Sequence, residues 1–226
     1  MGDGRHRVAI VTGAGGSLGA AVVRRLAARE FTIAVVDLRA SWCDTSLDAV
    51  GPARAGIWAF GADLRFLHEA EATVLRVAEE LGPPSMVVNA PFPGRATTSS
   101  EVPDWDSVVL AGLRAPLLVS RAAERYLIES GHGRIVNIAR TDSSEQPRPE
   151  ILVVRETLQA MTGTLSQELG PRGVRVNTVL AEIGADDEAA AMVDFLISDA
   201  ADDISGRMIE SRPPNPESSP AAGGVH

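Results

Sequence analysis

The chain of 226 residues is poor in several residue types: it has no lysine, one cysteine (Cys43) and one tyrosine (Tyr126). Arginine supplies every cationic side chain, which we attribute to coding bias. A single cysteine excludes a disulfide framework within the chain. No apolar run is long enough to span a bilayer, and the polar segment 1–7 predicts no secretory leader, so we expect a cytoplasmic protein without membrane contact.

The chain is acidic, with a net charge of −9 and an isoelectric point of about 5.0. This balance argues against a nucleic-acid partner, because phosphate backbones attract basic surfaces. The scattered histidines do not have the spacing of metal ligands, so no metal site is expected. They are His6, His68, His132 and His226.

Short apolar segments alternate with helical patterns along most of the chain. The expected strands are 8–11, 32–36, 57–60, 86–88, 134–138, 174–179 and a short last one at 208–209. The expected helices are 20–29, 67–81, 104–126 (with Asp104 as N-cap and a kink at Pro116), 151–169 and 187–196. Such alternation predicts a doubly wound parallel sheet, a Rossmann-type three-layer α/β/α domain over residues 7–210. Residues 211–226, rich in Pro, Ser, Gly and Ala, predict a disordered tail.

A glycine-rich turn follows the first expected strand and opens the first helix: Thr12-Gly13-Ala-Gly15-Gly-Ser17-Leu18-Gly19. Glycines there let main-chain amides approach a pyrophosphate, and the helix offers its positive end. Ser17 stands where a close-packing glycine is usual. Asp37 ends the second strand, where a carboxylate accepts from the ribose hydroxyls of NAD. Arg39 nearby would suit NADP; NAD is favoured.

With these motifs the chain resembles the short-chain dehydrogenase/reductase family over residues 7 to about 210. Further matching segments are Asp63-Leu64, Asn89-Ala90, Trp105-Asp106, 133–138, 173–177, 195–199 and 204–206. The resemblance implies NAD(P) binding through the following candidate residues. They are Thr12, Gly13, Gly15, Ser17, Leu18, Gly19, Asp37, Asp63, Leu64, Asn89 and Ala90.

The resemblance also implies a catalytic tetrad, and all four of its positions are changed. Ile151 stands at the tyrosine, Arg155 at the lysine, Arg140 at the serine and Gly112 at the asparagine. An isoleucine moves no proton, and losing one positioned acid–base group typically costs about 10²–10⁴ in rate. We therefore expect no intact catalytic residue and very slow hydride transfer by the isolated chain.

The family's substrate lid is expected to be missing as well. Ala181-Glu182 replaces the usual proline-glycine pair, and Ile183-Gly184 lead almost directly into the last long helix. Pro91, which replaces a glycine, is expected to narrow the nicotinamide end of the cleft. Binding of NAD or NADP is therefore expected to be weak or vestigial.

Arg140 and Arg155 are expected to lie close together, where unpaired buried guanidiniums would be costly. Glu182, Glu156 and Asp142 are candidate partners for a salt-bridge plug. The alternative is a site for a phosphate or carboxylate, such as a carrier protein's phosphopantetheine. The plug is favoured.

Two classes of function remain open. The first is a non-catalytic subunit, a pseudoenzyme that pairs with an intact homologous reductase as a heterodimer or heterotetramer. The pairing would use helices 104–126 and 151–169, through Val108, Leu158, Met161 and Leu165, although these residues could instead face the sheet. In pattern and size the chain is similar to the degenerate subunit of reductases in aminocoumarin antibiotic biosynthesis, which with an intact subunit oxidise a carrier-bound β-hydroxytyrosine.

The second class is a stand-alone enzyme with non-redox chemistry, an elimination or cyclisation that uses Arg140, Arg155 and Glu182. A dinucleotide sensor without chemistry is a third, weaker hypothesis.

Overall fold

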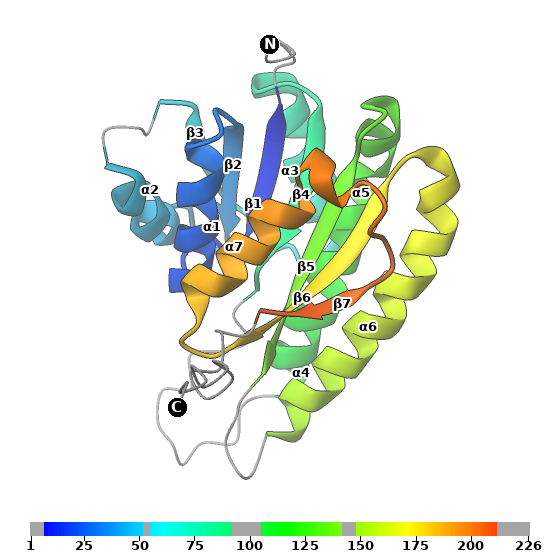
Figure 1. Cartoon of the computed structure of the whole chain (residues 1–226). Coiled ribbons are helices and arrows are strands. Elements are labelled where there is room, and N and C mark those ends of the chain that lie inside the picture. The colour runs from blue at the N-terminus through cyan, green and yellow to red at the C-terminus, as the bar shows by residue number, and fades with distance from the viewer. Residues whose placement is uncertain (1–6, 52–54, 92–104, 142–147, 212–226) are drawn as a thin grey trace, which may run out of the picture.

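Seven parallel strands form one sheet, and helices cover both of its faces (Figure 1). This computed structural model describes residues 7–51, 55–91, 105–141 and 148–211. The strand order is β3-β2-β1-β4-β5-β6-β7. The strands are β1 (Val8–Thr12), β2 (Thr32–Asp37), β3 (Ile57–Gly61), β4 (Pro84–Asn89), β5 (Arg134–Thr141), β6 (Arg175–Glu182) and β7 (Met208–Glu210). The predicted Rossmann-type fold is confirmed.

The central strands are apolar throughout because both of their faces are buried. In β1, Val8 and Ile10 pack into one core and Ala9 and Val11 into the other. The first core is closed by α3 (Leu67–Glu80), α5 (Ala115–Glu129) and α6 (Pro149–Leu169), and the second by α1 (Ser17–Ala27), α2 (Asp44–Val50) and α7 (Asp186–Leu196). Two-sided burial thus accounts for the runs of Val, Ile and Ala that predicted the strands.

The strand order places the site. The chain builds outward from β1 to β3, then crosses to β4 on the other side of β1 and continues to β7. In such a sheet, ligands bind beyond the carboxyl ends of the strands at the point where the order reverses. Both α1 and α7 begin at this edge, the lower one in Figure 1. The carboxyl edge beside β1 and β4 is therefore the place to look for function.

The structure corrects several element boundaries. The helix expected at 104–126 is divided into α4 (Trp105–Val109), a π-helical turn (Leu110–Arg114) and α5. Pro116 lies in the first turn of α5, and a proline, which lacks an N–H, disturbs the regular helical ladder there. The helix α2 and the short 3-10 helix before it (Ala40–Cys43) were not expected.

Some expectations concern residues outside the described ranges, namely Asp104 as N-cap, Asp142, His6, His226 and nearly all of the tail 211–226. Within the described ranges, no helix is long and apolar enough to cross a membrane. The link between β6 and α7, residues 183–185, is short, in agreement with the expectation of a missing lid.

Candidate functional site

The glycine turn makes close backbone contacts with other parts of the chain. Gly13 has φ +67°, and a Cβ there would lie 2.2 Å from the carbonyl oxygen of Ala90. A Cβ at Gly19 would lie 2.6 Å from the carbonyl oxygen of Gly13. Both positions therefore require glycine, because the turn is pressed against the end of β4 and folded onto the first turn of α1. Leu18 points into the core and is 5% exposed.

Several groups of the turn bind other parts of the chain. The Gly15 N–H donates to Asp37 Oδ2 over 2.8 Å, and the Leu38 N–H donates to Asp37 Oδ1 over 2.8 Å. A Cβ on Gly15 would also lie 2.8 Å from the carbonyl oxygen of Trp42. The 3-10 helix 40–43 thus packs against the glycine turn. The contact lies at the end of β2, beside the Asp37 carboxylate that is proposed to bind a ribose. Sequence reasoning missed this contact, because the segment has few apolar residues that would indicate a helix.

Asn89 lies inside the sheet edge. Its side-chain N–H donates to Asn137 Oδ1 over 2.9 Å, and its Oδ1 accepts from the Thr12 hydroxyl over 3.2 Å. Asn89 and Asn137 are fully buried, and Ala90 is 3% exposed. This network joins the ends of β1 and β4 to the middle of β5, so its members fix the strands beneath the candidate site.

Asp63 follows β3 and forms a bidentate pair with Arg65, with Nε at 2.7 Å and Nη2 at 2.6 Å from its oxygens. The hydrogen bonds and charge of Arg65 hold the pKa of the Asp63 carboxyl below its ordinary value. Leu64 beside it is buried against α3. Asp63 is therefore an ionised group whose two oxygens already have a partner.

Ile151 and Gly112, two of the four positions that the sequence interpretation assigns to a tetrad, are closely packed. Ile151, in the first turn of α6, is 4% exposed. Gly112 lies in the π-helical turn, where a Cβ would come within 3.0 Å of Val154 Cγ1. Val154 belongs to a small apolar cluster with Val108, Ala139, Leu158 and Leu180. Gly112 is therefore packed against an apolar cluster.

The two arginines of the tetrad positions bind different carboxylates. Arg140, on β5 and 6% exposed, donates through Nη1 to Asp186 Oδ1 over 2.9 Å. Arg155, whose side chain is about one-third exposed (32%), donates through Nε to Glu156 Oε1 over 2.9 Å. Arg140 thus forms an ion pair with Asp186, which the sequence interpretation did not name, whereas Arg155 pairs with Glu156, one of the acids that it did name. The other Asp186 oxygen accepts from the Ser17 hydroxyl.

The apolar residues proposed for a partner interface prove to belong to the core of the chain itself. Leu158 is fully buried, Leu165 is 1% exposed and Val108 is 2% exposed. Met161 is partly buried against the same clusters. The alternative that these residues face the sheet is the correct one, and an interface on these helices would need other side chains.

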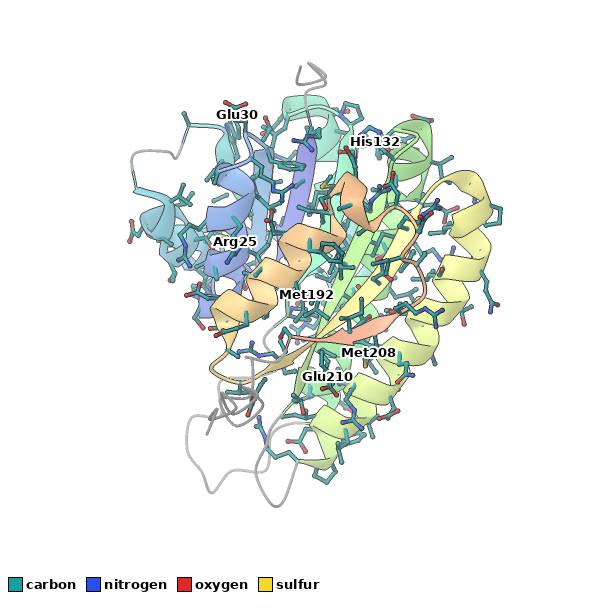
Figure 2. All side chains as sticks on the ribbon, viewed as in Figure 1. Arg25, Glu30, His132, Met192, Met208 and Glu210 are labelled. Carbon is teal, nitrogen blue, oxygen red and sulfur yellow. The ribbon has the colours of Figure 1, made fainter. Side chains whose placement is uncertain are left out.

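A hollow of about 290 Å³ lies between α7 and the end of β7. Figure 2 shows Met192 on α7 and Glu210 on β7, both of which line it together with Glu188, Phe195 and Ser211. Its walls are mostly apolar. In the described part of the chain, no three acidic, histidine or cysteine side chains group as metal ligands do.

A parallel sheet of this order, with a glycine turn between its first strand and helix, defines a Rossmann-like nucleotide-binding domain. Residues 7–185 match the family described as short chain dehydrogenase, so the chain belongs to the short-chain dehydrogenase family. Members of this family generally bind NAD(P). The glycines fit such a cofactor. Asp186 of α7 does not, because its carboxylate lies at the first turn of α1, where a phosphate would bind.

Named relatives are of similar size and moderate identity. The chain is 30% identical to D-threitol dehydrogenase of Mycolicibacterium smegmatis over 231 residues, 88% of this chain and 89% of that protein. It is 30% identical to short-chain reductase protein NovJ of Streptomyces niveus over 178 residues (77% and 68%). It is 32% identical to the (3R)-3-hydroxyacyl-CoA dehydrogenase of Canis lupus familiaris over 195 residues (78% and 73%).

Solved structures agree in fold. The citronellol catabolism dehydrogenase AtuB of Pseudomonas aeruginosa superposes with a TM-score of 0.79 at 24% identity, covering 90% of this chain and 92% of the other. At this identity the likeness supports the fold alone.

Proposed function

We propose that the chain is a non-catalytic subunit that pairs with an intact homologous reductase in the cytoplasm. The intact subunit would carry out NAD(P)-dependent oxidation or reduction of a β-hydroxy or β-keto substrate. The observation that carries the proposal is buried Ile151 at the position where the family places its proton donor. Without that donor the oxygen that gains negative charge during hydride transfer receives no proton from this chain.

The rest of the site supports the same reading. Tyr126, the sole tyrosine of the chain, lies on α5 and its hydroxyl contacts Arg125. Arg155 keeps a positive charge, but a guanidinium cannot serve as a tunable acid or base. Groups that act as a unit in catalysis lose most of their effect when one is removed. Hydride transfer by the isolated chain is therefore expected to lie near the background rate.

A surface for the partner remains on the outer faces of α4 and α6, which contact one another. Trp105 on α4 is 47% exposed and Val153 on α6 is 40% exposed. Arg121 of α5 and Glu168 of α6 form a two-pronged ion pair, 2.6 and 2.7 Å, that fixes the two helices together. Apolar side chains on a rigid helical face favour association with another protein surface.

The class of substrate is inferred from the relatives. One group is named for 3-hydroxyacyl-CoA oxidation, in which a β-hydroxy acyl thioester reacts. A carrier-bound β-hydroxy acyl group has the same reacting atoms. The proposal therefore places the chain beside a reductase of β-hydroxy thioesters in secondary metabolism, as in the aminocoumarin antibiotic pathways.

Mixing tests this function. Hydride transfer is followed by nicotinamide absorbance for the pure chain, for an intact homologous reductase from the same organism, and for the two together. We expect activity in the mixture well above the sum of the two. Val153→Glu should abolish the gain because the charge lies in the interface, whereas Leu75→Glu, on α3 and 45% exposed, should not. Full activity of the pure chain would contradict the proposal.

The alternative of non-redox chemistry by Arg140, Arg155 and Glu182 predicts turnover by the pure chain that is lost in Arg155→Ala. Arg140 is bound to Asp186 and Arg155 to Glu156, so the geometry does not favour it.

A further inference from the structure

Asp186 joins the start of α1 to β5. It is the first residue of α7, and its carboxylate accepts from the hydroxyl of Ser17, the first residue of α1, and from the guanidinium of Arg140 on β5. Arg140 is 6% exposed and the Asp186 side chain 20%. A carboxylate held between a buried guanidinium and the start of a helix occupies the kind of place that an anion takes at a helix N-terminus.

We propose that Asp186 is a built-in occupant of the phosphate end of the dinucleotide cleft. A dinucleotide phosphate would bind there only after the first turn of α7 moves away. The phosphate of a bound dinucleotide and the Asp186 carboxylate carry like charge, and both require the Ser17 hydroxyl and the positive end of α1. Two anions cannot share one set of donors without a large loss of affinity.

The short link explains why Asp186 reaches this place. Only Ile183, Gly184 and Ala185 separate β6 from α7, so α7 starts at the carboxyl edge of the sheet. The Ile183 N–H donates to the Thr141 carbonyl oxygen over 3.0 Å, which ties the start of the link to β5. Gly184, with φ +97°, makes the reversal that follows.

Three polar contacts then hold α7 along α1. Beyond the Ser17–Asp186 bond, Arg24 pairs with Asp187, and Arg29 Nη2 lies 2.9 Å from Asp194 Oδ2. Between them the two helices share one apolar core, which includes Ala21, Val22, Ala189 and Val193. Figure 1 shows α7 lying across α1 on the same face of the sheet. The packing of α7 on α1 therefore holds Asp186 in the phosphate position. This arrangement does not depend on the proposed partner subunit.

The test compares two neighbouring acids of the same helical turn. Asp186→Asn removes the charge and keeps the size of the side chain. Asp187→Asn is the matched control, because Asp187 pairs with Arg24 at the surface and its side chain is 71% exposed. The full chain is titrated with NADH by fluorescence, and thermal unfolding is followed with and without inorganic pyrophosphate.

We expect Asp186→Asn to bind NADH at least about tenfold more tightly than the natural chain, since one like charge near the phosphates is gone. Pyrophosphate should raise the melting temperature of Asp186→Asn, because no carboxylate then competes with it at the start of α1, and leave the natural chain and Asp187→Asn unchanged. Equal NADH affinity in all three proteins would overturn the proposal. So would pyrophosphate stabilisation of the natural chain as large as that of Asp186→Asn.

If Asp186→Asn does not fold, Asp186→Ser carries the test. A serine removes the like charge and keeps a hydroxyl that can bond the Ser17 side chain at the start of α7. NADH should then bind several-fold more tightly than to the natural chain, and an unchanged affinity would contradict the inference.

Discussion

A methyl group added at Gly112, the position where the resemblance implies an asparagine, should show how closely the surrounding side chains pack. A Cβ at this position lies 3.0 and 3.1 Å from the two methyl carbons of Val154, and Val154 is itself 5% exposed. Overpacking of this kind typically costs about 1–3 kcal/mol. Replacing glycine by alanine in a helix returns up to about 1 kcal/mol. Gly112→Ala should therefore lower the free energy of unfolding by about 0–2 kcal/mol.

Gly163 supplies the matched control, because it lies within α6 and a Cβ there meets nothing within 4 Å. Gly163→Ala should stabilise the chain by about 0.5–1 kcal/mol. Urea unfolding of both variants should thus separate them by about 0.5–3 kcal/mol, and the difference should shrink in a Val154→Ala background. Equal stabilisation by the two alanines would refute the packing argument, because it would show that a larger side chain fits at position 112.

Three further predictions concern stability and reactivity. Burial and the nearby acids raise the pKa of the Cys43 thiol to about 12. The thiol should therefore resist thiol reagents at mildly alkaline pH until urea unfolds the chain. Rapid labelling of the folded chain would contradict this. Arg65→Met should destabilise the chain at neutral pH only. The stabilisation by the Arg65–Asp63 pair is present above the unfolded pKa of Asp63 and is lost as the pH falls through the lowered folded pKa. A difference in unfolding free energy that persists in strong acid would refute the pairing. Leu158→Ala should lower the free energy of unfolding, measured in urea, by about 2–5 kcal/mol. Val153→Ala, on the same helix but exposed, should change it by no more than about 0.5 kcal/mol. Similar values for both variants would contradict the assigned faces of the helix.

Most of the fold could be predicted because its signals are local and repeated. Strands buried on both faces are continuous runs of Val, Ile and Ala, and each is bounded by glycine or a polar residue, as β1 is by Gly13. The segment 40–50 was missed because its helices are short and only half covered, which leaves a weak apolar pattern. The π-helical turn before Pro116 follows from helix packing, which a sequence pattern does not display.

The sequence predicts changes at the positions assigned to a tetrad, but not the contacts that the changed residues make. The replacement of the tyrosine and lysine by Ile151 and Arg155 stays a prediction, because it depends on the register assigned to α6. The partner of Arg140 could not be found, because Asp186 lies on another element, 46 positions further along the chain, and reaches the arginine only through the path of the 183–185 link. Leu158 and Leu165 were assigned to a possible interface because helical periodicity marks an apolar face without saying what covers it.

The central claim, that this chain is the non-catalytic half of a reductase, is tested most directly by native mass spectrometry of the tagged chain purified gently from its own host. The account predicts a complex with equal copies of a second short-chain reductase that has an intact tyrosine–lysine pair. Val153→Glu should dissolve this complex, and Leu75→Glu should not. A chain that is recovered only as a monomer or homo-oligomer would contradict the account.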